Sequence, residues 1–156
     1  MAKQETQWNL QYAKLLDYKQ KNGDCIVPRG YSKHDNKSRL GSWVNKQRNN
    51  HQHNTIRQDR KDLLDDIGFV WNVEDHEWNL QYAKLVAFQR QHDHCLVPIR
   101  YQQDESLGIW VRTQRAFHTS HRMRQARKDL LSELGFVWRA RSFFARENVR
   151  GIVVIG

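Results

Sequence analysis

Apolar residues recur with a helical period from the start of the chain. Trp8, Tyr12, Leu15 and Leu16 lie on one stripe of a 3.6-residue repeat. This stripe predicts an amphipathic helix from about residue 8 to about residue 22. Gly23 follows directly, and glycine at this position commonly provides the left-handed residue that ends a helix.

A short apolar run and a second helical stripe come next. In the run Cys25-Ile26-Val27-Pro28, the proline holds the preceding residue in an extended conformation. A variable, charged loop then leads to a second stripe, which consists of Leu40, Trp43, Val44 and Gln47. The pattern predicts a strand-like segment packed across the helices, followed by a second helix that begins near Leu40.

A third helix is predicted from its own start and stop signals. Thr55-Ile56-Arg57-Gln58 has the form of a Thr-x-x-Gln capping box, and Gly68 provides the stop. The apolar stripe between them consists of Ile56, Arg60, Leu63, Leu64 and Ile67. The Phe69-Val70-Trp71 segment is expected to fold back onto the core.

The whole pattern then repeats. The octapeptide 8–15 returns letter for letter at 78–85, the segment 40–48 returns as Leu-Gly-x-Trp-Val-x-x-Gln-Arg at 107–115, and Gly-Phe-Val-Trp returns at 135–138. Repeats of this kind define the folding unit. The sequence therefore predicts an all-α chain of two tandem three-helix modules, each with a short extended Val-Pro segment between its first and second helices. The expected divisions are 1–74, 75–140 and an irregular tail, 141–156. Because Asp93 replaces Gly23 in the second copy, that first helix is expected to end differently.

These ordered motifs resemble the helicase-associated domain family. The resemblance covers residues 8–71 and 78–138 and rests on four sub-motifs that each occur twice. It implies a compact helical module that binds nucleic acid and accompanies a helicase polypeptide or stands in an array. It implies no catalytic residues, and the chain lacks the Gly-x-x-x-x-Gly-Lys-Ser/Thr motif of a helicase motor.

Charge favours the same class of partner. The formal net charge is +9, which points to a polyanion, nucleic acid first. A basic protein without a specific partner is the plainer alternative. The leading interpretation is a non-catalytic module that binds DNA or RNA with weak sequence preference and needs no cofactor. The runner-up is a protein-interaction array that docks on a helicase or another acidic partner.

The second helix and its flanking loops are the predicted contact surface. Four aspartates, at 59, 62, 65 and 66, lie along the third helix, where they would repel a phosphate backbone. The cations assigned to nucleic-acid contact are Arg29, Lys33, Lys37, Arg39, Lys46, Arg48 and Arg57 in the first module, and Arg100, Arg112, Arg115, Arg122 and Arg124 in the second. Phosphate contact and pairing with a carboxylate such as Asp62 both remain open for Arg48. For Arg60, within an apolar stripe, a structural ion pair is favoured.

Aromatic and metal-binding residue types have plainer explanations. The six tryptophans could stack on unpaired bases, but their place on apolar stripes favours core packing. His92-Asp93-His94-Cys95 offers metal ligands, but the first copy has Asn22, Asp24 and Cys25 at the positions of His92, His94 and Cys95. We therefore expect no metal site, and cysteines that act as small buried hydrophobes. No apolar run approaches 18 residues, so no membrane span is expected. The two cysteines stand at equivalent positions of the repeat and are not expected to form a disulfide, which favours a reducing, intracellular compartment.

Overall fold

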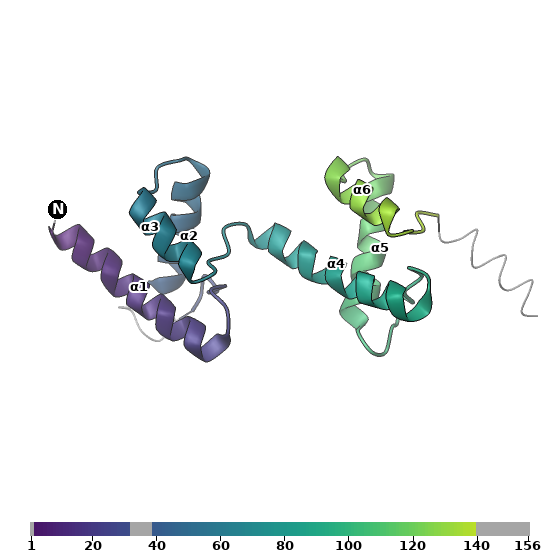
Figure 1. Cartoon of the computed structure of the whole chain (residues 1–156), viewed down its shortest axis with the longest axis horizontal. Helices are drawn as coiled ribbons and strands as arrows, with labels where there is room; N and C mark the ends of the chain where they lie inside the picture. The colour runs from purple at the N-terminus through teal and green to yellow at the C-terminus, as the bar shows by residue number, and fades with distance from the viewer. Residues whose placement is uncertain (1, 32–38, 140–156) are drawn as a thin grey trace, which may run out of the picture. The chain divides into compact units, whose positions relative to one another are not determined.

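The protein is described by a computed structural model that covers residues 2–31 and 39–139 (Figure 1). Across these residues the secondary structure is helical, without strands. The helices in chain order are α1 (Ala2–Asn22), α2 (Leu40–Gln52), α3 (Gln58–Asp66), α4 (Val73–His92), α5 (Glu105–Thr119) and α6 (Gln125–Glu133). The predicted all-α fold of two three-helix modules is confirmed. The predicted tail, 141–156, lies outside the described residues.

The chain divides into two compact units, Met1–His76 and Glu77–Gly156. In each unit the second helix crosses the first in the view of Figure 1, and the third helix contributes a buried leucine, Leu64 or Leu131, to the same core. The side chain of Asn72 caps α4, because its Oδ1 atom accepts a hydrogen bond from the amide of Asp75 at 3.0 Å. None of the described helices is long and apolar enough to cross a membrane.

Each unit encloses its own core. The buried apolar residues of the first unit are Trp8, Leu15, Tyr18, Cys25, Val27, Leu40, Val44, Leu64 and Phe69. Their counterparts in the second unit are Trp78, Leu85, Phe88, Cys95, Val97, Leu107, Val111, Leu131 and Phe136. The two lists match position by position, so what the repeat preserves is mainly the packing of each module.

The first helix differs from its prediction in length and in its buried face. It begins at Ala2 instead of Trp8. Leu16 is 41% exposed, and Gln11 and Tyr18 are buried in its place. Positions 8, 11, 15 and 18 also form a helical stripe, rotated slightly from the predicted one. The face that α2 and α3 cover decides between the two stripes.

The extended segment packs directly against the start of the second helix. A Cβ atom added at Gly41 would lie 2.3 Å from the carbonyl oxygen of Pro28, and one added at Gly108 would lie 2.3 Å from that of Pro98. The Leu-Gly motif is therefore a site of close approach between two backbones, which only glycine allows without a shift.

Two of the predicted helix ends are wrong. Asp93 adopts φ +63° and ends α4 with the same left-handed residue that Gly23 provides at +87°. The Thr55 box does not cap α3. The hydroxyl of Thr55 instead donates to the carbonyl of Asn50 at 3.2 Å, and the helix begins after Arg57, whose side chain makes no capping hydrogen bond. A threonine near a helix end has several local acceptors, and here the last turn of α2 supplies one.

Candidate nucleic-acid interface

The first tryptophan of each module belongs to the core. Trp8 is 5% exposed and Trp78 is 6% exposed. Their indole N–H groups donate to the Oε1 atoms of the buried Gln47 at 3.2 Å and Gln114 at 3.0 Å. The predicted core packing is confirmed for these two side chains. The glutamine of each Gln-Arg pair is therefore a buried acceptor, a role that the sequence pattern does not indicate.

The arginine within the third apolar stripe stacks on this tryptophan. The guanidinium of Arg60 lies 5.1 Å from the centre of the Trp8 ring, and that of Arg127 lies 5.1 Å from the centre of Trp78. Arg60 also pairs with Glu5 at 3.5 Å. The structural ion pair predicted for Arg60 is confirmed.

The arginine of each Gln-Arg pair is half-buried and bound to the backbone. Arg48 Nε donates to the carbonyl of Val70, and Arg115 Nε donates to that of Val137, both at 2.8 Å. Each guanidinium also lies over the phenylalanine before that valine, at 5.3 Å and 5.2 Å. Burial lowers the pKa of both guanidinium groups.

Arg48 therefore pairs with a carbonyl instead of the carboxylate of Asp62. The carboxylate of Asp62 accepts a hydrogen bond from Gln58 at 2.7 Å. Arg48 and Arg115 link the second helix of each module to the segment after the third helix. Both stabilise the fold, whatever else they contact.

The exposed cations lie mainly on the second helices and in the loops. Lys46 on α2 and Arg112 on α5 are exposed, and the described part of the chain offers neither side chain a hydrogen bond or an ion pair. The other exposed cations among the assigned residues are Arg29, Arg39, Arg57, Arg100, Arg122 and Arg124. Lys33 and Lys37 lie outside the described residues.

Arg57 differs from Lys46 and Arg112, because its side chain pairs with carboxylates. It stands just before α3, where it pairs with Glu5 at 2.9 Å and with Asp59 at 2.5 Å. These contacts raise the pKa of its guanidinium, through hydrogen bonds first to Asp59 and then to Glu5. A phosphate would have to displace two carboxylates to reach it, so Arg57 is a weaker candidate than Lys46.

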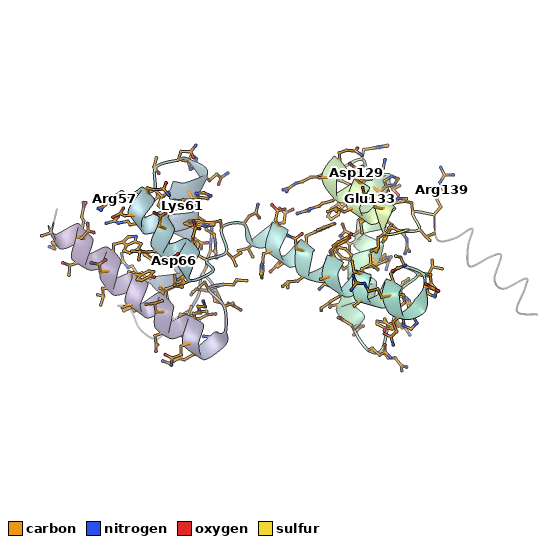
Figure 2. The ribbon with its side chains drawn as sticks, in the orientation of Figure 1. Arg57, Lys61, Asp66, Asp129, Glu133 and Arg139 are labelled. Carbon is orange, nitrogen blue, oxygen red and sulfur yellow. The ribbon has the colours of Figure 1, made fainter. Side chains whose placement is uncertain are left out.

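The third helix carries acids and internal pairs. Figure 2 shows Lys61 and Asp66 on α3, Arg57 just before that helix, and Asp129 and Glu133 on α6. Lys61 pairs with Asp65 at 2.5 Å, and the Trp71 indole donates to the same carboxylate at 2.6 Å. The hydrogen bond from Lys61, and then that from Trp71, lower the pKa of Asp65. The carboxylates along this face make it a poor surface for a phosphate backbone.

A cavity of about 590 Å³ opens beside α2 in the first unit. The lining residues come from the loop before α2, from α2 itself and from the segment after α3; they are Arg29, Asn45, Arg48, Asn49, His51, Gln52, Trp71, Asn72 and Val73. Two of them, Arg29 and Arg48, are among the cations predicted to contact nucleic acid, but the sequence pattern predicts no cavity. The missed signal was the row of amides on the outer face of α2.

The described residues hold no group of three or more potential ligands arranged for a metal ion. The ring of His92 instead packs on Phe88, with 4.3 Å between ring centres. Cys25 and Cys95 are buried free thiols, and burial raises the pKa of both. A raised pKa disfavours the thiolate that a cysteine nucleophile requires.

Comparison with known proteins matches both modules to one family. The family described as Helicase associated domain matches residues 5–72 and again residues 75–139. No curated protein and no solved structure matches the chain. Each matched stretch spans the three helices of one module, apart from the first residues of α1 and of α4.

Proposed function

The chain belongs to the helicase-associated domain family, and on that premise we propose that it is a non-catalytic accessory module that binds the phosphate backbone of nucleic acid. The binding surface consists of the exposed cations of α2 and α5 and of the loops around them. The family's description also connects such modules with helicases. We therefore infer that this chain works beside a helicase, inside the cell, and adds affinity for the strand on which the helicase acts.

The observation that carries the proposal is the different state of the cations on the second helices and on α3. Lys46 and Arg112 point outward without a carboxylate partner among the described residues. On α3, by contrast, Lys61 is paired with Asp65. A cation without a protein partner can neutralise a phosphate and release its counterion without first breaking an ion pair.

The proposed contacts favour phosphate over base edges. The exposed cations occupy different positions in the two copies: Lys46 corresponds to Thr113, and Arg112 corresponds to Asn45. A surface that keeps its charge while the positions of the cations change suits backbone contact, which carries no sequence information. Weak sequence preference is therefore part of the proposal.

The test is the salt dependence of binding by the full chain. Fluorescence anisotropy with labelled single- and double-stranded DNA and RNA gives the slope of log K against log salt. Lys46→Gln and Arg112→Gln should each reduce the magnitude of that slope by about 0.9 on duplex DNA, or by about 0.7 on a single strand, with similar losses on every sequence. Arg48 and Arg115 are left unchanged because they stabilise the fold.

Lys128→Gln is the matched control, because it removes the same charge from the third helix of the second unit. It should change the slope less than Arg112→Gln does. A larger effect of Lys128→Gln would identify the third helix as the binding face. A wild-type chain that binds none of the four nucleic acids at low salt would contradict the proposal altogether.

A further inference from the structure

The cavity beside α2 has a different chemistry from the basic surface around it. We propose that it holds one unpaired nucleotide of a bound strand, with the base inside and the phosphate at Arg29. This inference rests on the proposed function and adds to it a preference, located in the first unit, for unstacked bases. Its evidence is the charge, the donor pattern, the shape and the asymmetry of the lining.

The lining is suited to an anionic ligand. Two of its nine side chains are the guanidinium groups of Arg29 and Arg48, one is the imidazole of His51, and none is a carboxylate. Burial of the Arg48 charge in the wall strengthens its field inside the cavity, because little water screens it there. Arg29 is exposed and can meet a phosphate that remains in solvent.

Three amide side chains provide both hydrogen-bond donors and acceptors, whereas a phosphate needs only donors. Asn45, Asn49 and Gln52 lie at i, i+4 and i+7 on α2, so they form one row along the helix. Each amide can both donate and accept hydrogen bonds. The edges of nucleobases carry such mixed donors and acceptors, and Asn and Gln commonly recognise them.

One of these amides is oriented by the protein. Arg48 Nη1 donates to Asn45 Oδ1 at 3.2 Å, which places the amide oxygen of Asn45 toward the arginine. The NH2 group of Asn45 is then available to donate to an acceptor in the cavity. The contact that helps hold Arg48 in the fold thus also orients a donor for the ligand.

An aromatic wall and a restricted size complete the site. Trp71 is held by its hydrogen bond to Asp65 and by His51, whose ring centre lies 4.4 Å from its own. A volume of about 590 Å³ lies within the usual range of small-ligand sites, roughly 300–1,000 Å³. A base that is paired and stacked inside a duplex cannot enter a cavity in a protein surface. A base must therefore leave its stack to enter, which favours single strands, loops and ends.

The second copy does not retain the amide row. Its residues at the positions of Asn45, Asn49 and Gln52 are Arg112, Ala116 and Thr119, and Ile99 replaces Arg29. Three other positions are identical in the two copies: Arg48, His51 and Trp71 correspond to Arg115, His118 and Trp138. The residues common to both copies maintain the fold, and those that make the cavity polar are specific to the first unit. The second unit is therefore an internal control.

The decisive variant removes two amides and no charge. Asn49→Ala with Gln52→Ala, in the full chain, should weaken binding to a ten-nucleotide single strand by about tenfold, the loss that follows from removing a good base contact. Binding to an abasic strand of the same length, and to a duplex, should not change. The slope of affinity against salt should also stay constant, because no phosphate contact is removed.

Thr119→Ala at the corresponding position of α5 is the matched control and should leave all affinities unchanged. Circular dichroism of each variant verifies that the helices are retained. This is expected because Asn49 and Gln52 are exposed on α2. An equal loss of affinity for the abasic strand, or no loss of affinity for any strand, would contradict the assignment of the cavity to a nucleotide. A wild-type chain that binds strands in a salt-dependent way while the double variant binds equally well would overturn the pocket alone and leave the proposed function standing. Failure of the wild type to bind any strand would remove both.

A second measurement uses the wild-type chain. Titration with a five-nucleotide single strand, followed by NMR of the side-chain amides, should shift the resonances of Asn45, Asn49 and Gln52. The matching abasic strand should leave these resonances in place. Shifts confined to α5, or identical shifts with both strands, would contradict the assignment.

Discussion

Replacement of Gly108 by alanine distinguishes the tertiary contact from helix propensity, because the two predict changes of opposite sign in the free energy of unfolding. Gly108 lies in the first turns of α5 (Glu105–Thr119), where alanine is intrinsically favoured over glycine by about 1 kcal/mol. Propensity alone therefore predicts a more stable variant. The structure predicts the reverse, since the new Cβ would lie 2.3 Å from the carbonyl oxygen of Pro98 and 2.8 Å from that of Ile99.

The magnitude follows from the displacement that this contact requires. Ordinary contact begins at 3.4 Å, so one of the two backbones must move by 3.4 − 2.3, about 1.1 Å. Overpacking that forces backbone shifts costs about 1–3 kcal/mol, and both partners here are backbone atoms in a segment held by the buried Cys95 and Val97. A cost near the upper end, less the gain of about 1 kcal/mol from propensity, leaves a net loss of about 2 kcal/mol. For a unit of this size that corresponds to a melting midpoint lower by roughly 10 °C.

Urea unfolding of the full chain, followed by tryptophan fluorescence, measures this loss. Gly41→Ala repeats the experiment in the first unit, where the corresponding distance to Pro28 is also 2.3 Å. Ser42→Ala, at the exposed neighbour on α2, is the control and should be neutral or slightly stabilising. An unchanged or raised midpoint for Gly108→Ala would refute the reasoning, because it would mean that the two backbones can separate at little cost.

Two further predictions concern stability. Arg115→Gln should lower the free energy of unfolding by about 1–3 kcal/mol, because it removes the donor to Val137 and the cation over Phe136; an unchanged thermal midpoint with weaker strand binding would instead assign Arg115 to phosphate contact. Asp104→Ala should cost about 1 kcal/mol at neutral pH by removing the cap on Leu107 N. Hydrogen bonds from Ser106 and then Lys84 lower the Asp104 pKa from 3.8 to about 2, so this stabilisation is complete above about pH 4 and is lost as pH falls through about 2. The difference between wild-type and variant midpoints should therefore shrink in that window, and a constant difference would contradict the assignment.

Local sequence signals predicted the order of the helices well, but not their buried faces or their caps. The glycine after each third helix and the apolar stripes placed the helices correctly, because hydrogen bonds and side-chain spacing within a helix depend on neighbours three and four residues away. The same local information could not choose between Leu16 and Tyr18 as core residues, since both fit a helical stripe. It also misplaced the cap of α3, because the hydroxyl of Thr55 donates to Asn50 in the last turn of α2.

The candidate site was predicted less completely than the fold. Exposed cations such as Lys46 could be recognised from their outward positions in a predicted helix. The role of Arg48 could not, because its acceptor is a carbonyl 22 residues away and only packing makes that carbonyl accessible. The buried Gln47 is a similar case, since its partner, the Trp8 indole, lies 39 residues away.

By itself, the sequence determined the repeat, the number and order of the helices, the residues that form most of each core, and the excess of positive charge. These properties depend on periodicity and composition, which need no knowledge of distant contacts. Only the tertiary structure decided which arginines stabilise the fold, why glycine stands at 41 and 108, and that residues from three segments line one cavity. Each of these depends on the approach of groups far apart in the chain, where a difference of one ångström separates a contact from a clash.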